Sequence, residues 1–374
     1  MSYYILPKNN KNYVFNITTN TPDGPPVIIS QTLLNSLFGV YSQIEKYLQD
    51  DLTNIIQNIN PYEFVFTNVY DTAMSISKIV TSSNIYYELF EIIHTFFIFE
   101  NSIFLGDARF LYIGPNIDAC KLLINTTRNI TDDDIVGGLF SNLDFINDAE
   151  KYDCMMFECN TISSVLKNNF TQTYLTIEIQ NLCISFFMIC KSLNKGGVAI
   201  LKITSLTHKS SIDLLLLLCN MFEKVVLFKP LLTHILSNDK YIVCSKFNEN
   251  HKEYYISMLQ PIIESILTNE ILNISSILNN DIPYNYLNKV EEFNAINGQQ
   301  QLETFDQVIN IIHNKNRADK LESLKRTNIQ KGILWCEKNR IPHNKFIDKL
   351  NIFLNLSNES KQSDWTNELN IFCN

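Results

Sequence analysis

The sequence predicts an α/β domain built on a mostly parallel sheet. Short apolar runs bounded by turn residues, such as RFLYIG and YDCMMFE, alternate with longer stretches in which apolar residues recur every three or four positions. Runs that are apolar throughout are typical of parallel strands covered by helices on both faces. The last two runs, EKVVLFKPLL and DKYIVCSKF, are joined by a segment without a helical pattern, so we expect these strands to pair antiparallel.

The same pattern divides the 374 residues into three regions. Residues 1–65 combine a polar, proline-containing segment with a long amphipathic stretch, and they are predicted to form an N-terminal helical extension. Residues 66–250 carry the alternation of strands and helices, and residues 251–374 return to helical periodicity. Because single cores rarely grow beyond about 250–300 residues, we expect one large α/β domain with helical regions on either side.

Composition limits the partners and the compartment. A formal net charge of -9 disfavours indiscriminate binding to nucleic acid or to anionic membranes. Most cysteines lie inside apolar runs, without a CxxC pair or a Cys/His spacing suited to zinc. We therefore expect buried thiols, a reducing cytoplasmic compartment and no metal. The most apolar stretch, YYELFEIIHTFFIFENSIF, is interrupted by charged residues, so no membrane span is predicted.

Candidate functional residues stand at the ends of the predicted strands. Gly114 and Pro115 follow RFLYI, Glu158 follows YDCMMF, Lys202 follows GGVAIL, and Asp239 stands just before the run YIVCSKF. Open α/β sheets bind ligands where the carboxyl ends of their strands meet, so we expect two acids and a lysine to converge at one edge. A simpler interpretation treats Lys202 and Asp239 as strand-end charges of an unrelated α/β domain.

Several short motifs occur in the order and spacing of a known family. They are Gly196-Gly197, Lys202, Lys229-Pro230 and the run Tyr241-Ile242-Val243. With these motifs, residues 80–250 resemble the FtsJ-type RNA ribose 2′-O-methyltransferases, especially the cap-directed branch of eukaryotes and large DNA viruses. The resemblance implies a Rossmann-like methyltransferase sheet with an antiparallel final strand, S-adenosylmethionine as cofactor, and RNA, including capped mRNA, as partner. For a viral source it also implies the host cytoplasm or the virion as location, and the abundance of Ile and Asn fits the AT-rich genome of such a virus.

The family uses a Lys-Asp-Lys-Glu tetrad in which the central lysine takes the proton of the ribose hydroxyl. The resemblance assigns Lys202 to the central lysine, Glu158 to the aspartate and Asp239 to the glutamate. The helix of the first lysine corresponds to YYELFEII, which puts Glu88 in that place, and Lys78 in SISKIV is the alternative for a shifted alignment. An acid at the first position is expected to hold Lys202 as an ammonium rather than to free it as a base.

The resemblance also assigns cofactor contacts. The family's glycine-rich turn corresponds to YIGPN, which retains only Gly114 and Pro115, and the side chains that follow are expected to crowd a cofactor. Glu158 lies beside this turn in the same family pattern. The segment NLDFIND resembles the family's GDF segment and implies that Asp144 contacts the adenine. The acids of the TDDD run, residues 132–134, are either a ribose contact or a solvated turn.

Substrate contacts are implied at two places. Lys229 and His234 lie in the KP segment, where His234 takes the place of a family arginine. Basic residues also gather between positions 315 and 349, and Lys325 and Arg326 lie among them. This gathering is either an RNA-facing patch or an ordinary solvated helix face.

These departures from the family leave two functions open. One is a weakly active S-adenosylmethionine-dependent methyltransferase that modifies mRNA caps with an unusual tetrad. The other is an inactive RNA-binding or scaffold subunit of a transcription or capping apparatus, with protein partners of its own. Glu88 and the reduced glycine turn favour weakened or lost activity.

Overall fold

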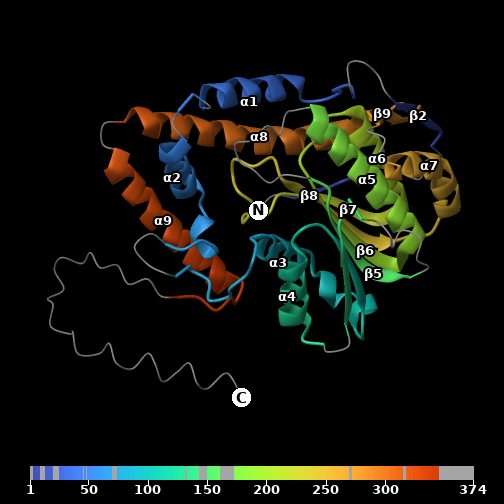
Figure 1. The fold of residues 1–374 in the computed structure, drawn as a ribbon, viewed down its shortest axis with the longest axis horizontal. Coiled ribbons are helices and arrows are strands. Elements are labelled where there is room, and N and C mark those ends of the chain that lie inside the picture. Colours follow the sequence, from blue (N-terminus) through green and yellow to red (C-terminus); the bar gives the residue numbers. More distant parts are fainter. Residues whose placement is uncertain are drawn as a thin grey trace.

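The computed structural model describes the elements that frame the predicted site (Figure 1). Its described residues are 3–8, 13–19, 25–44, 46–47, 49–69, 74–130, 133–142, 150–160, 172–268, 272–314 and 317–344. The helices are α1 (Gln31–Ile44), α2 (Gln49–Ile59), α3 (Ile85–Phe96), α4 (Ile117–Arg128), α5 (Gln172–Ser192), α6 (Lys209–Met221), α7 (Lys252–Leu267), α8 (Tyr284–His313) and α9 (Arg317–Lys338). The strands are β1 (Tyr3–Ile5), β2 (Phe15–Thr19), β3 (Arg109–Ile113), β4 (Asp134–Gly138), β5 (Tyr152–Glu158), β6 (Leu193–Ile203), β7 (Phe222–Phe228), β8 (Lys240–Phe247) and β9 (Ile274–Leu278).

Within the described residues, the main sheet has seven strands in the order β1-β7-β8-β6-β5-β3-β4. The strands β4, β3, β5 and β6 pair in parallel, and β8 runs antiparallel to both β6 and β7. The predicted α/β fold class is therefore confirmed: the sheet is mostly parallel and Rossmann-like, with the antiparallel strand β8 between β6 and β7. The predicted antiparallel pairing of the last two runs is also confirmed.

Helices cover both faces of this sheet, as the fully apolar strands require. One face packs against α5 and α6, and its cluster of buried residues includes Leu111, Phe157 and Leu201. The other face packs against α3 and α4 and includes Phe110 and Met156. Alternate residues of the same strand thus enter opposite cores, which explains why these strands show no polar alternation.

The two terminal regions contain strands that the helical prediction for them did not include. β1 pairs antiparallel with β7 and so forms an edge of the main sheet, and β2 pairs with β9 in a separate two-stranded sheet. Their helices share a third cluster of buried residues, in which α1, α2 and α8 enclose Leu236 of the loop between β7 and β8. Figure 1 shows α1 lying alongside α8, and α9 and α2 at the same end of the molecule. The N-terminal region thus contains the helices α1 and α2 and the C-terminal region the helices α7, α8 and α9, together with these three strands, which the sequence pattern did not indicate.

One described helix is long and apolar enough to cross a membrane. The segment Thr173–Ser192 of α5 passes that test by length and composition, but 78% of its most apolar window is buried inside the protein. A helix that is apolar on all sides is either membrane-embedded or enclosed in a core, and this helix packs against α6, α7 and the sheet. The burial is thus explained by the fold.

Candidate functional site

Four residues from four elements meet at the carboxyl edge of the parallel strands. Glu158 is the last residue of β5 and is aligned with Lys202 near the end of β6. Asp239 precedes β8, whose residue Tyr241 is aligned with Lys202 on the other side. Glu88 reaches the same point from α3. The structure therefore brings together all four residues of the predicted tetrad.

Lys202 is enclosed by carboxylates. Its Nζ lies 2.8 Å from Oε2 of Glu88 and 3.4 Å from Oδ2 of Asp239. The hydroxyl of Tyr241 donates to the same Glu88 oxygen, and Nδ2 of Asn84 donates to the other at 2.9 Å. Glu88 therefore has a partner on each oxygen, and it binds Lys202 directly.

The cluster is also closed to solvent. Glu88 is 1% exposed, Lys202 3%, Asp239 4% and Glu158 8%. Burial alone would lower the pKa of Lys202, but the charges of Glu88, Asp239 and Glu158 outweigh it and raise that pKa well above its usual value. Lys202 is consequently an ammonium at neutral pH, as expected from an acid at position 88.

Glu158 is bound in a different way. Burial raises its pKa to about 7, against the opposing effect of Lys202. The hydroxyl of Tyr112 donates to its Oε1, and Nδ2 of Asn116 lies 3.0 Å from Oε1 and 3.1 Å from Oε2. These contacts direct the Glu158 side chain toward the turn after β3. Both of its carboxylate oxygens therefore already have hydrogen-bond donors within the protein.

The turn after β3 does not fit S-adenosylmethionine. A Cβ at Gly114 would lie 2.8 Å from Oε1 of Glu158 and 2.9 Å from its Cβ, so the space over this glycine is filled by Glu158. Ile117, at the start of α4, packs in the same way onto Gly137 of β4. In Rossmann sheets the glycines leave room for the ligand, whereas here the protein's own side chains occupy that room. No reaction step through this cofactor follows from the residues present.

Two of the acids expected to contact the cofactor's adenosine, Asp133 and Asp134, lie among the described residues. Asp144 lies outside the described residues. Asp133 directly precedes β4, and Asp134 is its first residue. Both therefore lie at the amino end of the strand, opposite the site. Asp133 forms a buried ion pair with Arg128 at 2.6 Å, and Asp134 pairs with Arg109 at 2.9 Å. Asp133 is therefore buried in an ion pair, whereas Asp134 is an exposed residue of β4, and both lie at the opposite end of the strands from the tetrad.

The predicted substrate residues Lys229 and His234 hold the loop between β7 and β8 in shape. Nζ of Lys229 donates to the carbonyl oxygens of Ile235, at 3.4 Å, and of Ser237. The backbone N–H of Leu236 donates to Nδ1 of His234 at 3.2 Å. Burial lowers the pKa of Lys229 to about 7 and that of His234 to about 3, so His234 carries no positive charge for RNA at neutral pH.

Lys325 and Arg326 lie on α9. Arg326 pairs with Glu322 at 3.3 Å and is exposed, while the side chain of Lys325 is only 14% exposed. Lys78, the alternative first lysine, is exposed, and its backbone N–H donates to the carbonyl of Pro342. Lys78 therefore does not join the buried cluster, and Glu88 is the residue at that position.

Sequence reasoning missed the residues that complete the cluster. Tyr112 and Tyr241 lie inside apolar strands, and Asn160 donates to Oδ1 of Asp239 at 2.9 Å. A second acid, Glu91, accepts hydrogen bonds at 3.0 Å from the backbone N–H of Leu231. A recognisable signal existed for Glu91, because two acids three residues apart in an apolar helix lie on the same face and need buried partners.

Comparisons with known proteins give fold likeness only. No family model matches the chain, and no curated protein matches it. Among solved structures, a ribosomal RNA methyltransferase from Plasmodium falciparum shares 18% identity over 44% of this chain and 97% of its own, with a TM-score of 0.31. A fibrillarin pre-rRNA processing protein from Methanococcus jannaschii shares 15% identity over 38% and 67% of the two chains, with a TM-score of 0.22. PigF in complex with SAH shares 12% identity over 58% and 71%, with a TM-score of 0.24. The fold class itself follows from the sheet described above.

Proposed function

We propose that this chain is a non-catalytic, RNA-binding subunit of a transcription or capping apparatus, built on a methyltransferase fold. The observation that carries the proposal is the buried ion pair between Lys202 and Glu88, 2.8 Å long. A lysine that acts as a base must be neutral when the substrate arrives. With Asp239 also within 3.4 Å of its Nζ, Lys202 is held in the charged form.

The environment of Gly114 supports the same conclusion independently. Glu158 fills the space over this glycine and is bound there by Tyr112 and Asn116. A cofactor carboxylate or sulfonium placed at this turn would have to displace a buried, hydrogen-bonded side chain. Loss of the base and loss of the cofactor space together favour a protein that keeps the fold without the reaction.

The RNA-binding part of the proposal is supported by α9. Lys320, Lys331 and Lys338 are exposed, and their spacings of 11 and 7 residues place them on one stripe of the helix. At about 1.5 Å per residue the stripe is about 27 Å long, enough to follow several phosphates of an RNA strand. Lys325 and Arg326 lie between Lys320 and Lys331 in sequence. This local basic surface stands out in a chain with a net charge of -9.

Calorimetric titration of the full chain with S-adenosylmethionine tests the cofactor part of the proposal. We expect no heat of binding at millimolar cofactor, because Glu158 occupies the space at Gly114. Micromolar binding would contradict the proposal and would favour a functional methyltransferase.

Fluorescence anisotropy with a labelled single-stranded RNA tests the RNA part. We expect binding that weakens steeply with salt, and about tenfold or more weaker binding when Lys320, Lys331 and Lys338 are all changed to Gln. A matched control changes Lys195, Lys224 and Lys246, three exposed lysines of the main sheet, to Gln. Binding that is absent, independent of salt, or equally reduced in both triple variants would contradict RNA binding by α9.

A further inference from the structure

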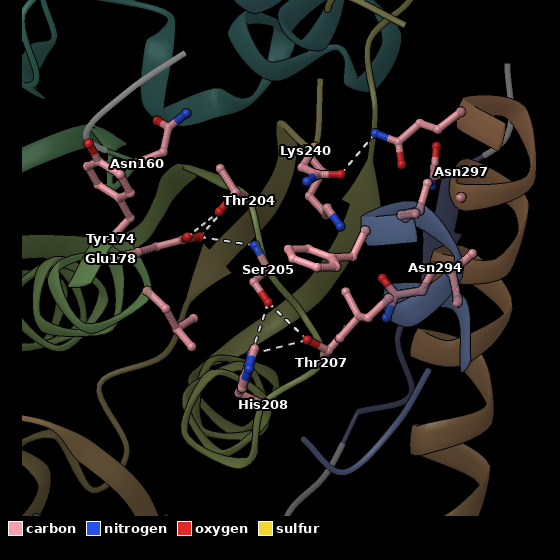
Figure 2. Close-up of a pocket in the computed structure, with 18 of the residues that line it drawn as sticks. Asn160, Tyr174, Glu178, Thr204, Ser205, Thr207, His208, Lys240, Asn294 and Asn297 are labelled. Atoms are coloured by element: carbon pink, nitrogen blue, oxygen red, sulfur yellow. Dashed lines mark hydrogen bonds between the residues drawn. The ribbon is translucent and has the colours of Figure 1, made fainter. Parts of the chain in front are cut away.

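A cavity of about 250 Å³ is lined by Asn160, Lys240 and Asn294, among other residues (Figure 2). Residues of α1 and α8 line one part of it, and residues of α5, of the turn after β6 and of the start of β8 line the rest. Asn160 lines the cavity and also donates to Asp239, so the cavity adjoins the cluster without including Lys202. The cavity exists because the helices of the two terminal regions pack over the carboxyl edge of the sheet.

Two polar groups in the cavity wall lack a partner among the described residues. The side chain of Lys240, the first residue of β8, is partly exposed and forms no hydrogen bond or ion pair there. Burial lowers its pKa to about 8, and the charges of Glu178 and Asp239 oppose that effect. Asn294 of α8 is 4% exposed; its Nδ2 donates to the carbonyl of Leu206 at 2.8 Å, while its buried Oδ1 accepts nothing. Figure 2 shows both side chains at the same space. A buried acceptor without a donor is costly, and an ammonium at the surface of a cavity can bind an anionic group.

Four other polar side chains of the wall, those of Glu178, Ser205, Thr207 and His208, form hydrogen bonds within the protein. The carboxylate of Glu178 accepts hydrogen bonds from the hydroxyl and backbone N–H of Thr204 and from the N–H of Ser205. The hydroxyls of Ser205 and Thr207 each lie within 3.1 Å of Nδ1 of His208. Lys240 and Asn294 are the two groups of the wall that we assign to a ligand.

Helix α1 contributes an apolar part of the wall. Leu34, Leu37 and Phe38 of α1 line the cavity, opposite the turn after β6. A ligand that satisfies the whole wall has an acidic group for Lys240, a hydrogen-bond donor or a bridging water for Asn294, and a compact apolar body for α1. The volume limits such a ligand to a small molecule.

We propose that this cavity binds a small organic anion, a carboxylate or a phosphate monoester, whose acidic group pairs with Lys240 while its apolar body lies against α1. The site is separate from the proposed RNA surface on α9 and does not depend on it. In the complex the ammonium of Lys240 gains a hydrogen-bonded acidic partner, whereas Glu178 and Asp239 act on its charge without forming an ion pair with it.

Ligand-observed NMR and calorimetry on the full chain test this site with three probes of similar shape. Benzoate and phenyl phosphate carry the two kinds of acid, and benzamide is their neutral counterpart. We expect at least one of the acids to bind about tenfold or more tightly than benzamide, because only the acids can form a hydrogen-bonded charge pair with Lys240. Which acid binds better identifies the class of ligand. No binding of either acid, or equal binding of benzamide, would overturn the proposal.

Variants locate the binding. Lys240→Met removes the ammonium, and we expect it to abolish the preference for the acid over benzamide. Lys246→Met removes an exposed lysine from the same strand and should leave the preference unchanged. Circular dichroism verifies that each variant is folded. Phe38→Ser provides a second test, and because Phe38 is 56% exposed the change leaves the core intact. We expect it to weaken the binding of every probe that enters the cavity. Acid binding that survives Lys240→Met, or that is insensitive to Phe38→Ser, would place the probes outside the cavity and overturn the assignment.

Discussion

Lys202 and Glu88 form an ion pair of 2.8 Å in which the two side chains are 4% and 1% exposed. The pair joins α3 to the end of β6, across 114 residues of sequence. It fixes the protonation of Lys202 and buries the residue that the family resemblance assigns to catalysis. The same ion pair thus stabilises the fold and keeps Lys202 in its charged form, in which it cannot accept a proton.

Glu88→Gln should destabilise the protein strongly. The variant leaves Lys202 buried with Asp239 as its remaining anionic contact below 4 Å among the described residues. Breaking a buried pair by removing one partner costs about 3 kcal/mol or more, and urea denaturation measures the loss. Glu223→Gln is the matched control, since the Glu223–Lys246 pair is 57% and 61% exposed and its loss should cost less than about 1 kcal/mol. Similar small losses in both variants would show that Glu88 is not coupled to Lys202.

Stability should fall as pH rises from about 4.5 toward and just past 7. Burial raises the pKa of Glu158 and of Glu91 to about 7 in the folded chain, while both return to ordinary values near 4.5 on unfolding. Over this interval the folded state binds more protons than the unfolded state, so the free energy of unfolding decreases with pH. Each pKa unit of difference corresponds to about 1.4 kcal/mol.

Denaturation curves across this pH range check the prediction, with Glu158→Gln as the comparison. A neutral amide cannot lose a proton, so the variant should show a shallower decline than the wild-type chain. Identical pH profiles for the two proteins would refute the raised pKa of Glu158.

Gly114→Ala should destabilise the protein by about 1–3 kcal/mol, because the added methyl would lie 2.8 Å from Oε1 of Glu158 and the buried side chain would have to move. Gly106→Ala is the control, since no atom lies within 4 Å of a Cβ at that position. Thermal unfolding distinguishes the two. An equally small effect at both glycines would mean that the space over Gly114 is free, and the cofactor question would reopen.

Gln301→Leu should loosen the loop between β7 and β8. Nε2 of Gln301 in α8 lies 3.2 Å from the carbonyl of Leu236, 2.8 Å from that of Ser237 and 2.9 Å from Oδ1 of Asn238. The variant leaves these acceptors without this donor, which costs about 1–3 kcal/mol. We expect faster hydrogen exchange across residues 229–239 than in the wild-type chain. Gln299→Leu, an exposed position two residues away, should leave exchange unchanged, and equal effects would argue against a role of α8 in fixing this loop.

The central strands could be predicted from sequence because they are buried on both faces. β5, β6 and β8 are apolar runs whose strand character does not depend on their neighbours. β1 has three residues and β4 ends in Gly137 and Gly138, so neither carries such a signal, and pairing with another strand is what makes each a strand. The same holds for β2 and β9, which pair across more than 250 residues of sequence.

The site residues at the strand ends could be predicted from the sequence, but the residues that bind them could not. Lys202 and Asp239 could be placed because the ends of adjacent strands must meet. Tyr112 and Tyr241 could not, because whether a residue within an apolar strand faces the site depends on strand register. The cavity beside Lys240 depends on α1 and α8, which are far apart in sequence, and no local pattern indicates their association.

Methyl transfer from labelled S-adenosylmethionine to capped RNA, compared between the wild-type chain and Lys202→Ala, tests most directly whether Lys202 can act as a base. With Lys202 held as an ammonium by Glu88 and Asp239, we predict no transfer above background in either protein. Transfer by the wild-type chain that disappears in Lys202→Ala would contradict the non-catalytic function proposed for this protein.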